Sequence, residues 1–290
     1  MTLPFDQERP IGTRGFSLVE LLVAMAVLSL LVVMLAQMVA LTSQAISIDS
    51  KKIDAAGQAR LVFDRLASDL ASMPSRPDFG MMFTKAAGND SFQFYSQVDG
   101  YSGARQIAAV GYRIQQSTPG RLYQLERGAV GTDWGPSITS NPLVQFLPNT
   151  QAIATNTDPN YDVLASGVFR LEFCYVLTTG QFYSPPNNST SPYVVYCDNP
   201  TGAAFYNGNP TSSKIAAVVI AVGILDTNSQ KLISSNQLGQ LATALPDNTS
   251  GDDPIADWNT AMAKPTFAPA GIPAQVVQNI RFYERTFYVP

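Results

Sequence analysis

The sequence predicts an α+β protein in which one long N-terminal helix packs on a mainly antiparallel β-rich head. The helix is expected to have a transmembrane half and an amphipathic half. Residues 16–41 are predominantly apolar and carry Glu20 as their only charge, and no proline occurs over residues 11–73. After Pro74 the pattern changes to short alternating segments between loops rich in proline, glycine and asparagine, which is typical of strands. Residues 74–290 are therefore expected to form the head.

The apolar segment, residues 16–41, is long enough as a helix to cross the roughly 30 Å of hydrocarbon in a bilayer. Arg9 and Arg14 lie on its N-terminal side, which favours a cytoplasmic N-terminus and an extracytoplasmic head. Residues 42–73 should continue the helix, because apolar residues recur there at three- and four-residue steps. This stripe consists of Ile46, Ile53, Ala56, Ala59, Val62, Phe63, Leu66 and Leu70.

The composition of the chain narrows the classes of function. It contains no histidine, which excludes Ser-His-Asp and Cys-His catalysis and any imidazole metal site, so we expect no enzyme. The formal net charge of −4 argues against a nucleic-acid partner held by a strong basic field. Charged residues make up 14% of the chain, below the roughly 25% of an average soluble domain.

The head should contain several strands and two short helices. Residues 108–114 and 121–127 flank a Thr-Pro-Gly turn and predict a hairpin. Residues 193–197 are expected to pair with residues 168–176. Residues 214–226 are apolar nearly throughout and predict a central strand buried on both faces. Further strands are expected over residues 91–98 and 277–289, and helices over residues 234–244 and 255–263.

Gly15, Phe16 and Glu20 stand at the start of the apolar segment. An ionised carboxylate in hydrocarbon costs at least a few kcal/mol. Glu20 is therefore expected either to have a partner that compensates its charge or to have a functional role there. Residues 14–20, with the apolar helix behind them, resemble the processing site of type IV pilins and type II secretion pseudopilins. The resemblance implies that a prepilin peptidase cleaves after Gly15, which makes residues 1–15 a leader peptide, and that Phe16 is then N-methylated.

The same resemblance implies an assembly role for Glu20. Cleavage would create an α-amino group on Phe16, and Glu20 of one subunit could pair with that amine on a neighbour. Removing one partner of a buried ion pair costs about 3–5 kcal/mol, so such a pair would strongly favour assembled subunits. The alternative is an ordinary signal anchor in which Glu20 snorkels or is protonated.

In the head, residues 112–113 followed by residues 122–128 resemble the hairpin of J-type pseudopilins and W-type minor pilins. The resemblance implies a pilin-like minor subunit that assembles into, or caps, a type II secretion or type IV pilus-like filament. Its partners would be prepilin peptidase, other pseudopilins or pilins, the inner-membrane assembly platform and membrane lipid. The chain would span the inner membrane once, with the head in the periplasm, before it enters the filament. The alternative is a pilus-tip adhesin or cargo-binding module on the same anchor.

Two other sets of residues are candidates for a cross-link or a metal site. Cys174 and Cys197 would form a disulfide if the head lies outside the cytoplasm, and otherwise are two buried free thiols. The densest group of hard oxygen ligands consists of Asp247, Asp252, Asp253 and Asp257. Calcium prefers such ligands, although acidic loops rich in glycine and asparagine are usually solvated turns. No other cofactor is expected.

Overall fold

The computed structural model describes residues 15, 17–74, 80–101, 107–115, 123–131, 161–187, 193–196, 215–248, 253–267, 269 and 271–288. The chain divides into two compact units, Met1–Ser50 and Lys51–Pro290. Helix α1 (Leu18–Ala71) contributes to both units and contains 54 residues. The predicted uninterrupted helix is therefore confirmed, and it ends two residues before the expected position.

The described part of the first unit consists of Gly15, Ser17 and the part of α1 up to Ser50. An 18-residue window of this helix reaches a mean hydropathy of 2.8, and none of that window is buried. By length and composition the helix could cross a membrane. Its large side chains, from Leu18 to Leu41, are exposed, as expected of a segment whose partners are lipid or other helices.

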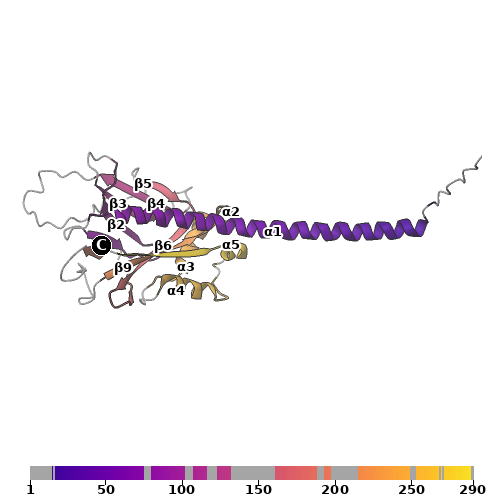
Figure 1. Ribbon diagram of the computed structural model, residues 1–290. Coiled ribbons are helices and arrows are strands. Elements are labelled where there is room, and N and C mark those ends of the chain that lie inside the picture. The colour runs from indigo at the N-terminus through magenta and orange to yellow at the C-terminus, as the bar shows by residue number, and fades with distance from the viewer. Residues whose placement is uncertain are drawn as a thin grey trace, which may run out of the picture. The chain divides into compact units, whose positions relative to one another are not determined.

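The second unit contains two antiparallel sheets (Figure 1). The six-stranded sheet has the order β5-β4-β3-β2-β1-β8 and the four-stranded sheet the order β10-β9-β6-β7. The first sheet is built from β1 (Gly80–Thr84), β2 (Ser91–Ser96), β3 (Ala108–Gln115), β4 (Gln124–Gly131), β5 (Tyr161–Ala165) and β8 (Tyr193–Tyr196). The second is built from β6 (Val168–Leu177), β7 (Phe182–Tyr183), β9 (Ile215–Ile224) and β10 (Arg281–Tyr288).

The main core lies between the two sheets and the C-terminal half of α1. That half of the helix buries Ala55, Ala59, Val62, Phe63 and Leu66, at three- and four-residue steps along one face. Aromatic residues from both sheets meet this face, including a tilted contact between the rings of Phe63 and Phe287. The stripe expected from the sequence is confirmed from Ala59 onwards, but it is wrong at its start. Ile46, Ile53 and Ala56 are exposed, and Ala55 is buried instead.

A helical layer covers the other face of the four-stranded sheet. It contains α2 (Thr227–Gln230), α3 (Ser235–Ala244), α4 (Pro254–Met262) and α5 (Ala274–Gln278). These helices enclose a second core around Trp258, which is fully buried. Strand β9 lies between the two cores, so the expected central strand buried on both faces is confirmed. The helices over residues 234–244 and 255–263 are also confirmed within two residues.

Three of the expected elements are wrong in partner or extent. Strand β8 pairs with β1, whereas β6 pairs with β9 and β7, so residues 193–197 do not join residues 168–176. The strand expected over residues 277–289 begins at Arg281, because helix α5 follows Pro273 and occupies the preceding residues. The hairpin is confirmed as β3 and β4, which pair over eight residues, but its second strand runs over Gln124–Gly131 and not over residues 121–127 as expected.

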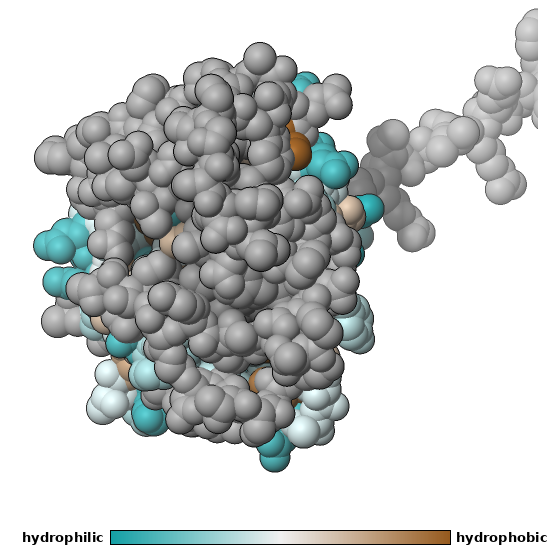
Figure 2. Space-filling model, turned by 90° about the vertical axis from the view of Figure 1, so that its left-hand side faces the viewer, coloured by the Kyte–Doolittle hydropathy of each residue, from teal (hydrophilic) through white to brown (hydrophobic). Residues whose placement is uncertain are grey.

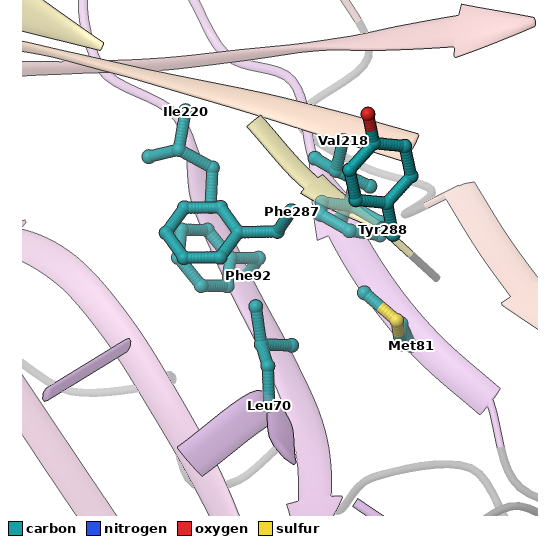
Figure 3. A pocket seen from close by; sticks show the side chains of 8 residues that line it. Leu70, Met81, Phe92, Val218, Ile220, Phe287 and Tyr288 are labelled. Carbon is teal, nitrogen blue, oxygen red and sulfur yellow. The ribbon is translucent and has the colours of Figure 1, made fainter. Parts of the chain in front are cut away.

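A small apolar pocket, partly open to solvent, lies between the two sheets near the end of α1 (Figure 3). Its lining consists of Leu70, Met81, Phe83, Phe92, Val218, Ile220, Phe287 and Tyr288. Seen from the left-hand side of Figure 1, the coloured surface residues of the head are mainly hydrophilic, with small separate brown areas (Figure 2). Most of the residues that line the pocket belong to the main core.

Candidate functional site

The N-terminus of α1 is closed by a side-chain cap. Ser17 Oγ accepts a hydrogen bond of 3.1 Å from the Glu20 backbone N–H, and the Ser17 carbonyl accepts one of 3.2 Å from the Leu21 N–H. Helix N-termini leave backbone N–H groups without partners, and a serine at this position satisfies one of them. Sequence reasoning missed Ser17, although the spacing Ser-x-x-Glu is that of a capping box.

Gly15 and Glu20 lie on the exposed surface at this end of the helix. No described atom lies within 4 Å of a Cβ built on Gly15, so packing within the described chain does not explain a glycine there. Phe16 lies outside the described residues. The cap on Ser17 fixes the helix start beside Glu20 and leaves the Gly15 backbone accessible.

In the head, Asp69 fastens α1 to the six-stranded sheet. Its carboxylate accepts hydrogen bonds from Arg127 Nε at 2.6 Å and Arg127 Nη2 at 3.0 Å, and from the Tyr112 hydroxyl at 2.5 Å. Arg65, one helical turn earlier, adds an ion pair of 3.4 Å. Burial, together with the Asp69 charge, raises the pKa of Tyr112 well above its ordinary value. Asp69 itself is fully buried, so these donors are what compensates its charge.

Earlier turns of α1 are fixed by hydrogen bonds to backbone groups. Asp54 Oδ2 accepts the Thr227 N–H and the Thr227 hydroxyl, each at 3.1 Å, at the start of α2. Gln58 Oε1 accepts the Gly167 N–H at 2.8 Å, and a Cβ on Gly167 would collide with this side chain. The helix is thus attached to the head by its polar flank as well as by its apolar face.

Residues 12–36 match the family model described as the prokaryotic N-terminal methylation motif. The start of this chain is therefore similar to the N-terminal methylation motif of prokaryotic proteins. The match covers Gly15, Phe16, Ser17 and Glu20, together with the apolar start of α1. The motif therefore coincides with the capped, exposed helix start.

The structure also has similarity to the type IV-like pilin TTHA1219 from Thermus thermophilus. The two chains are 14% identical, and the match covers 81% of this chain and 94% of the other, with a TM-score of 0.37. No curated protein matches this sequence.

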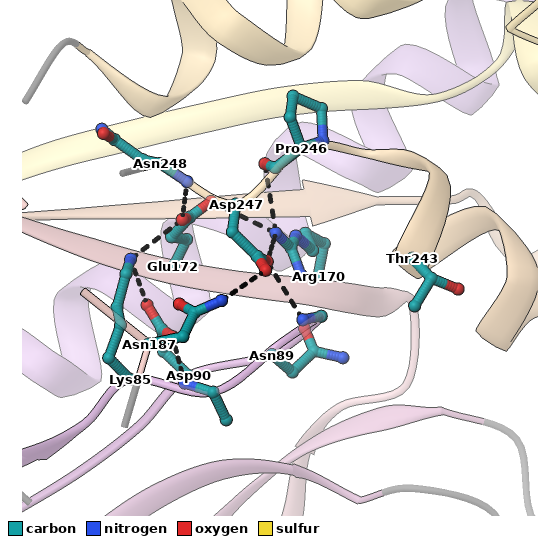
Figure 4. A network of polar contacts seen from close by, with 12 residues as sticks. Lys85, Asn89, Asp90, Arg170, Glu172, Asn187, Thr243, Pro246, Asp247 and Asn248 are labelled. Carbon is teal, nitrogen blue, oxygen red and sulfur yellow. Dashed lines mark hydrogen bonds and ion pairs between the residues drawn. The ribbon is translucent and has the colours of Figure 1, made fainter. Parts of the chain in front are cut away.

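The head contains a network of buried charges near the end of β1 (Figure 4). Lys85 Nζ donates to Asp90 Oδ2 at 2.8 Å, to Glu172 Oε1 at 2.9 Å and to the Phe173 carbonyl at 3.1 Å. The three acceptors satisfy the three donors of the ammonium group. A buried cation is tolerated here because two carboxylates neutralise it.

The loop after β1 takes the place of a neighbouring strand along part of one edge of β6. Asn89 Oδ1 accepts the Leu171 N–H at 2.9 Å, and Asp90 Oδ2 accepts the Phe173 N–H at 3.1 Å. The Asp90 N–H donates in turn to the Leu171 carbonyl at 3.0 Å. Since β1 belongs to one sheet and β6 to the other, this loop joins the two sheets.

Arg170 extends the network to the segment between α3 and α4. Its Nη2 donates to Asp247 Oδ1 at 2.7 Å and to the Pro246 carbonyl at 3.2 Å. The Asp247 carboxylate also accepts the Gly88 N–H at 3.0 Å and the Asn187 side-chain amide at 2.8 Å. Four segments far apart in the sequence therefore meet at one buried cluster (Figure 4).

The acidic residues considered for calcium have other contacts in the described chain. Burial raises the pKa of Asp247, but hydrogen bonds from Arg170 and Gly88 outweigh it and leave that pKa below its ordinary value. Asp253 caps α4 through the Ile255 N–H at 2.9 Å, Asp257 lies in the first turn of α4, and Asp252 is outside the described residues. The described residues contain no group of three His, Cys, Asp or Glu side chains able to hold a metal ion. A calcium site here stays a prediction.

Cys174 is buried in β6 and forms no disulfide within the residues that the structure describes, and burial raises the pKa of its thiol to about 12. Its expected partner, Cys197, lies outside the described residues. The disulfide therefore also stays a prediction.

A pH effect on stability is expected from Glu284 in β10. Burial, with a hydrogen bond to Asp253 and the charge of that residue, raises the pKa of Glu284 from 4.5 to about 7. The folded state therefore keeps a proton that the unfolded state loses, and the free energy of unfolding should fall as pH rises from about 4.5 to 7. Because Glu284 is partly exposed, the slope should be less than about 1.4 kcal/mol per pH unit.

Urea unfolding of the full chain at several pH values would measure this slope. Glu284→Gln removes the titrating group but keeps a hydrogen-bonding side chain, so the difference between the two profiles isolates its contribution. Parallel profiles from pH 4.5 to 7 would contradict the assignment.

Proposed function

We propose that this chain is a minor pseudopilin or pilin subunit that is cleaved by prepilin peptidase after Gly15, N-methylated at Phe16 and assembled into, or onto the tip of, a type II secretion or type IV pilus-like filament. The observation that carries the proposal is the methylation motif over residues 12–36, placed at the capped and exposed start of an apolar helix. The role is structural and not enzymatic.

The proposed location follows from the same helix. Before assembly, the apolar part of α1 anchors the chain in the inner membrane, and Arg9 and Arg14 keep the leader on the cytoplasmic side. The head is then periplasmic. After cleavage, the helix leaves lipid for the filament, where other pilin-like helices replace the lipid around its exposed apolar residues.

Glu20 supplies the specificity of assembly in this proposal. The carboxylate is exposed in the single chain, whereas a filament would bring it next to the new α-amino group of a neighbour's Phe16. The partners are therefore prepilin peptidase, other pseudopilins or pilins, the inner-membrane assembly platform and membrane lipid.

Processing is tested directly by co-expression of the full chain with a prepilin peptidase. The intact mass should fall by the mass of residues 1–15 and rise by the mass that one N-methylation adds. N-terminal sequencing should begin at Phe16. Gly15→Ala should leave most of the chain at the precursor mass. A chain that keeps residues 1–15 with an active peptidase would refute the proposal.

Gly57→Ala provides a matched control for the processing experiment. Gly57 lies in the same helix, and no described atom lies within 4 Å of a Cβ built there. The substitution should favour the helix by about 1 kcal/mol and leave cleavage unchanged. Equal loss of processing in both variants would mean that the peptidase does not depend on Gly15 specifically.

A further inference from the structure

The Lys85 cluster holds an amine and two carboxylates in a geometry that could react. Lys85, Asp90 and Glu172 have side chains that are 0%, 2% and 1% exposed. The Lys85 nitrogen is 2.8 Å from Asp90 Oδ2 and 2.9 Å from Glu172 Oε1, so it is already in contact with both carboxyl groups. Fixed proximity of this kind replaces much of the entropy needed to bring two reactants together.

The two carboxylates differ in their surroundings. Both oxygens of Asp90 face backbone donors, the Ala86 N–H at Oδ1 and the Phe173 N–H at Oδ2, each at 3.1 Å. Glu172 is held by the Arg170 guanidinium at 3.4 Å and by the Asn248 N–H. Asp90 is therefore surrounded by donors able to stabilise charge on a carbonyl oxygen, and Glu172 is fixed beside the lysine as a proton acceptor.

Proton transfer within the Lys85–Asp90 pair determines its reactive form. Burial raises the pKa of Asp90 to about 6, although Lys85 opposes the shift. Burial lowers the pKa of Lys85, but Asp90 and Glu172 outweigh it and raise that pKa. The resting pair is thus ammonium and carboxylate, and the reactive form arises when one proton passes from Lys85 Nζ to Asp90. In this dry site that transfer removes two charges that burial disfavours.

We propose that Lys85 and Asp90 condense into an intramolecular amide bond between Nζ and Cγ, with Glu172 as the proton carrier. The Lys85 nitrogen attacks Asp90 Cγ, and the backbone N–H groups of Ala86 and Phe173 stabilise the oxygen that gains charge. Glu172 takes a proton from the attacking nitrogen and gives it to the departing oxygen. One N–C bond forms, one C–O bond breaks and one water molecule leaves, so no oxidant or other reactant is needed.

Such a bond would fix the loop that joins the two sheets. Lys85 follows β1, and Asp90 lies against the edge of β6. The cross-link would hold this loop in the conformation in which Asn89 and Asp90 occupy the position of a strand beside β6. It would also convert a buried ion pair into a neutral amide. It would form once, after folding, because the unfolded chain brings neither Glu172 nor the Phe173 N–H to the lysine.

Tryptic peptide mapping of the full chain, purified in detergent, tests the proposal without any substitution. An amide on Lys85 blocks cleavage there, and the Arg76–Pro77 bond resists trypsin, so one peptide spanning residues 66–105 should appear, lighter than expected by one water molecule. Fragmentation should place the link between Lys85 and Asp90. Cleavage after exposed Lys231 is the internal control for complete digestion.

Peptides 66–85 and 86–105 at full mass would overturn the proposal. A link from Lys85 to Glu172 would refute Asp90 as the acceptor. Chain that is isolated in denaturant before it has folded should have the full mass. It should lose one water molecule only after it is refolded. Loss of the water before folding would contradict assistance by the folded site.

Glu172→Gln tests the proton carrier, because it keeps the shape and hydrogen-bonding capacity of the side chain. General acid–base assistance contributes about 10²–10⁴-fold in rate, so the refolded variant should form the link at least about a hundredfold more slowly. Its circular dichroism should match the wild type. A folded variant that cross-links at the wild-type rate would remove Glu172 from the mechanism.

Discussion

Replacing Glu20 by alanine is expected to leave the chain processed but to exclude it from filaments. In the proposed assembly the Glu20 carboxylate neutralises the α-amino group of Phe16 on a neighbouring subunit. Loss of one partner leaves the other charge buried without compensation, which costs about 3–5 kcal/mol. At about 1.4 kcal/mol per factor of ten, incorporation should fall roughly a hundredfold or more.

The measurement compares the processed chain in sheared filaments with the processed chain left in membranes. Glu20→Gln should behave like Glu20→Ala, because it keeps the length of the side chain but lacks the charge. Incorporation of Glu20→Ala at the wild-type level would contradict the pairing.

Ser17→Ala distinguishes pairing from helix capping. It removes the hydroxyl that accepts the Glu20 N–H but retains the carboxylate. Loss of an N-cap costs about 1 kcal/mol, so assembly should fall about fivefold or less. If Ser17→Ala and Glu20→Ala reduced assembly equally, Glu20 would act only through the start of its own helix.

Local patterns in the sequence were sufficient for the elements whose physics is local. The long helix follows from an apolar run without proline, and its packed face follows from the spacing of Val62, Phe63 and Leu66. Strand β9 is apolar on both faces because a core lies on each side of it. The Ser17 cap is also local, since its signal lies within four residues, but it was not predicted.

Partner choice between strands is not a local property, and there the sequence reasoning failed. The aromatic and β-branched residues 193–196 predict a strand but say nothing about its neighbour, which is β1. Glycines 111 and 128 lie opposite each other in β3 and β4, and a Cβ on either would collide with the Tyr161 ring. Only the three-dimensional contact explains why these strands carry glycine.

Local sequence patterns also did not predict the buried charges. Lys85 lies in a loop whose sequence resembles a solvated turn, and its partner Glu172 is 87 residues away. Asp247 is a candidate calcium ligand in the sequence because acidic residues follow it. In the structure its carboxylate accepts a hydrogen bond from Arg170. A lone carboxylate in sequence has no marker that tells a metal ligand from an ion-pair partner.

Asp69→Ala is expected to be among the most destabilising single substitutions in the head. It would leave the Arg127 guanidinium, whose side chain is 15% exposed, and the buried Tyr112 hydroxyl without their shared acceptor. The expected loss is about 3–5 kcal/mol of unfolding free energy, measured by urea unfolding of the full chain in detergent. Asp69→Asn keeps one acceptor oxygen and should lose less.

Asp64→Ala is the matched control, one and a half turns earlier on the same helix. Asp64 pairs with Arg60 at 3.4 Å and Arg285 at 3.2 Å, but its side chain is 58% exposed. Exposed pairs contribute about 0–1 kcal/mol, so this variant should unfold close to the wild type. Equal losses at Asp64 and Asp69 would show that burial of the carboxylate is not the source of stability. A loss confined to Asp69 would mean that the end of α1 is held to the sheet by a compensated charge and not by its apolar face alone.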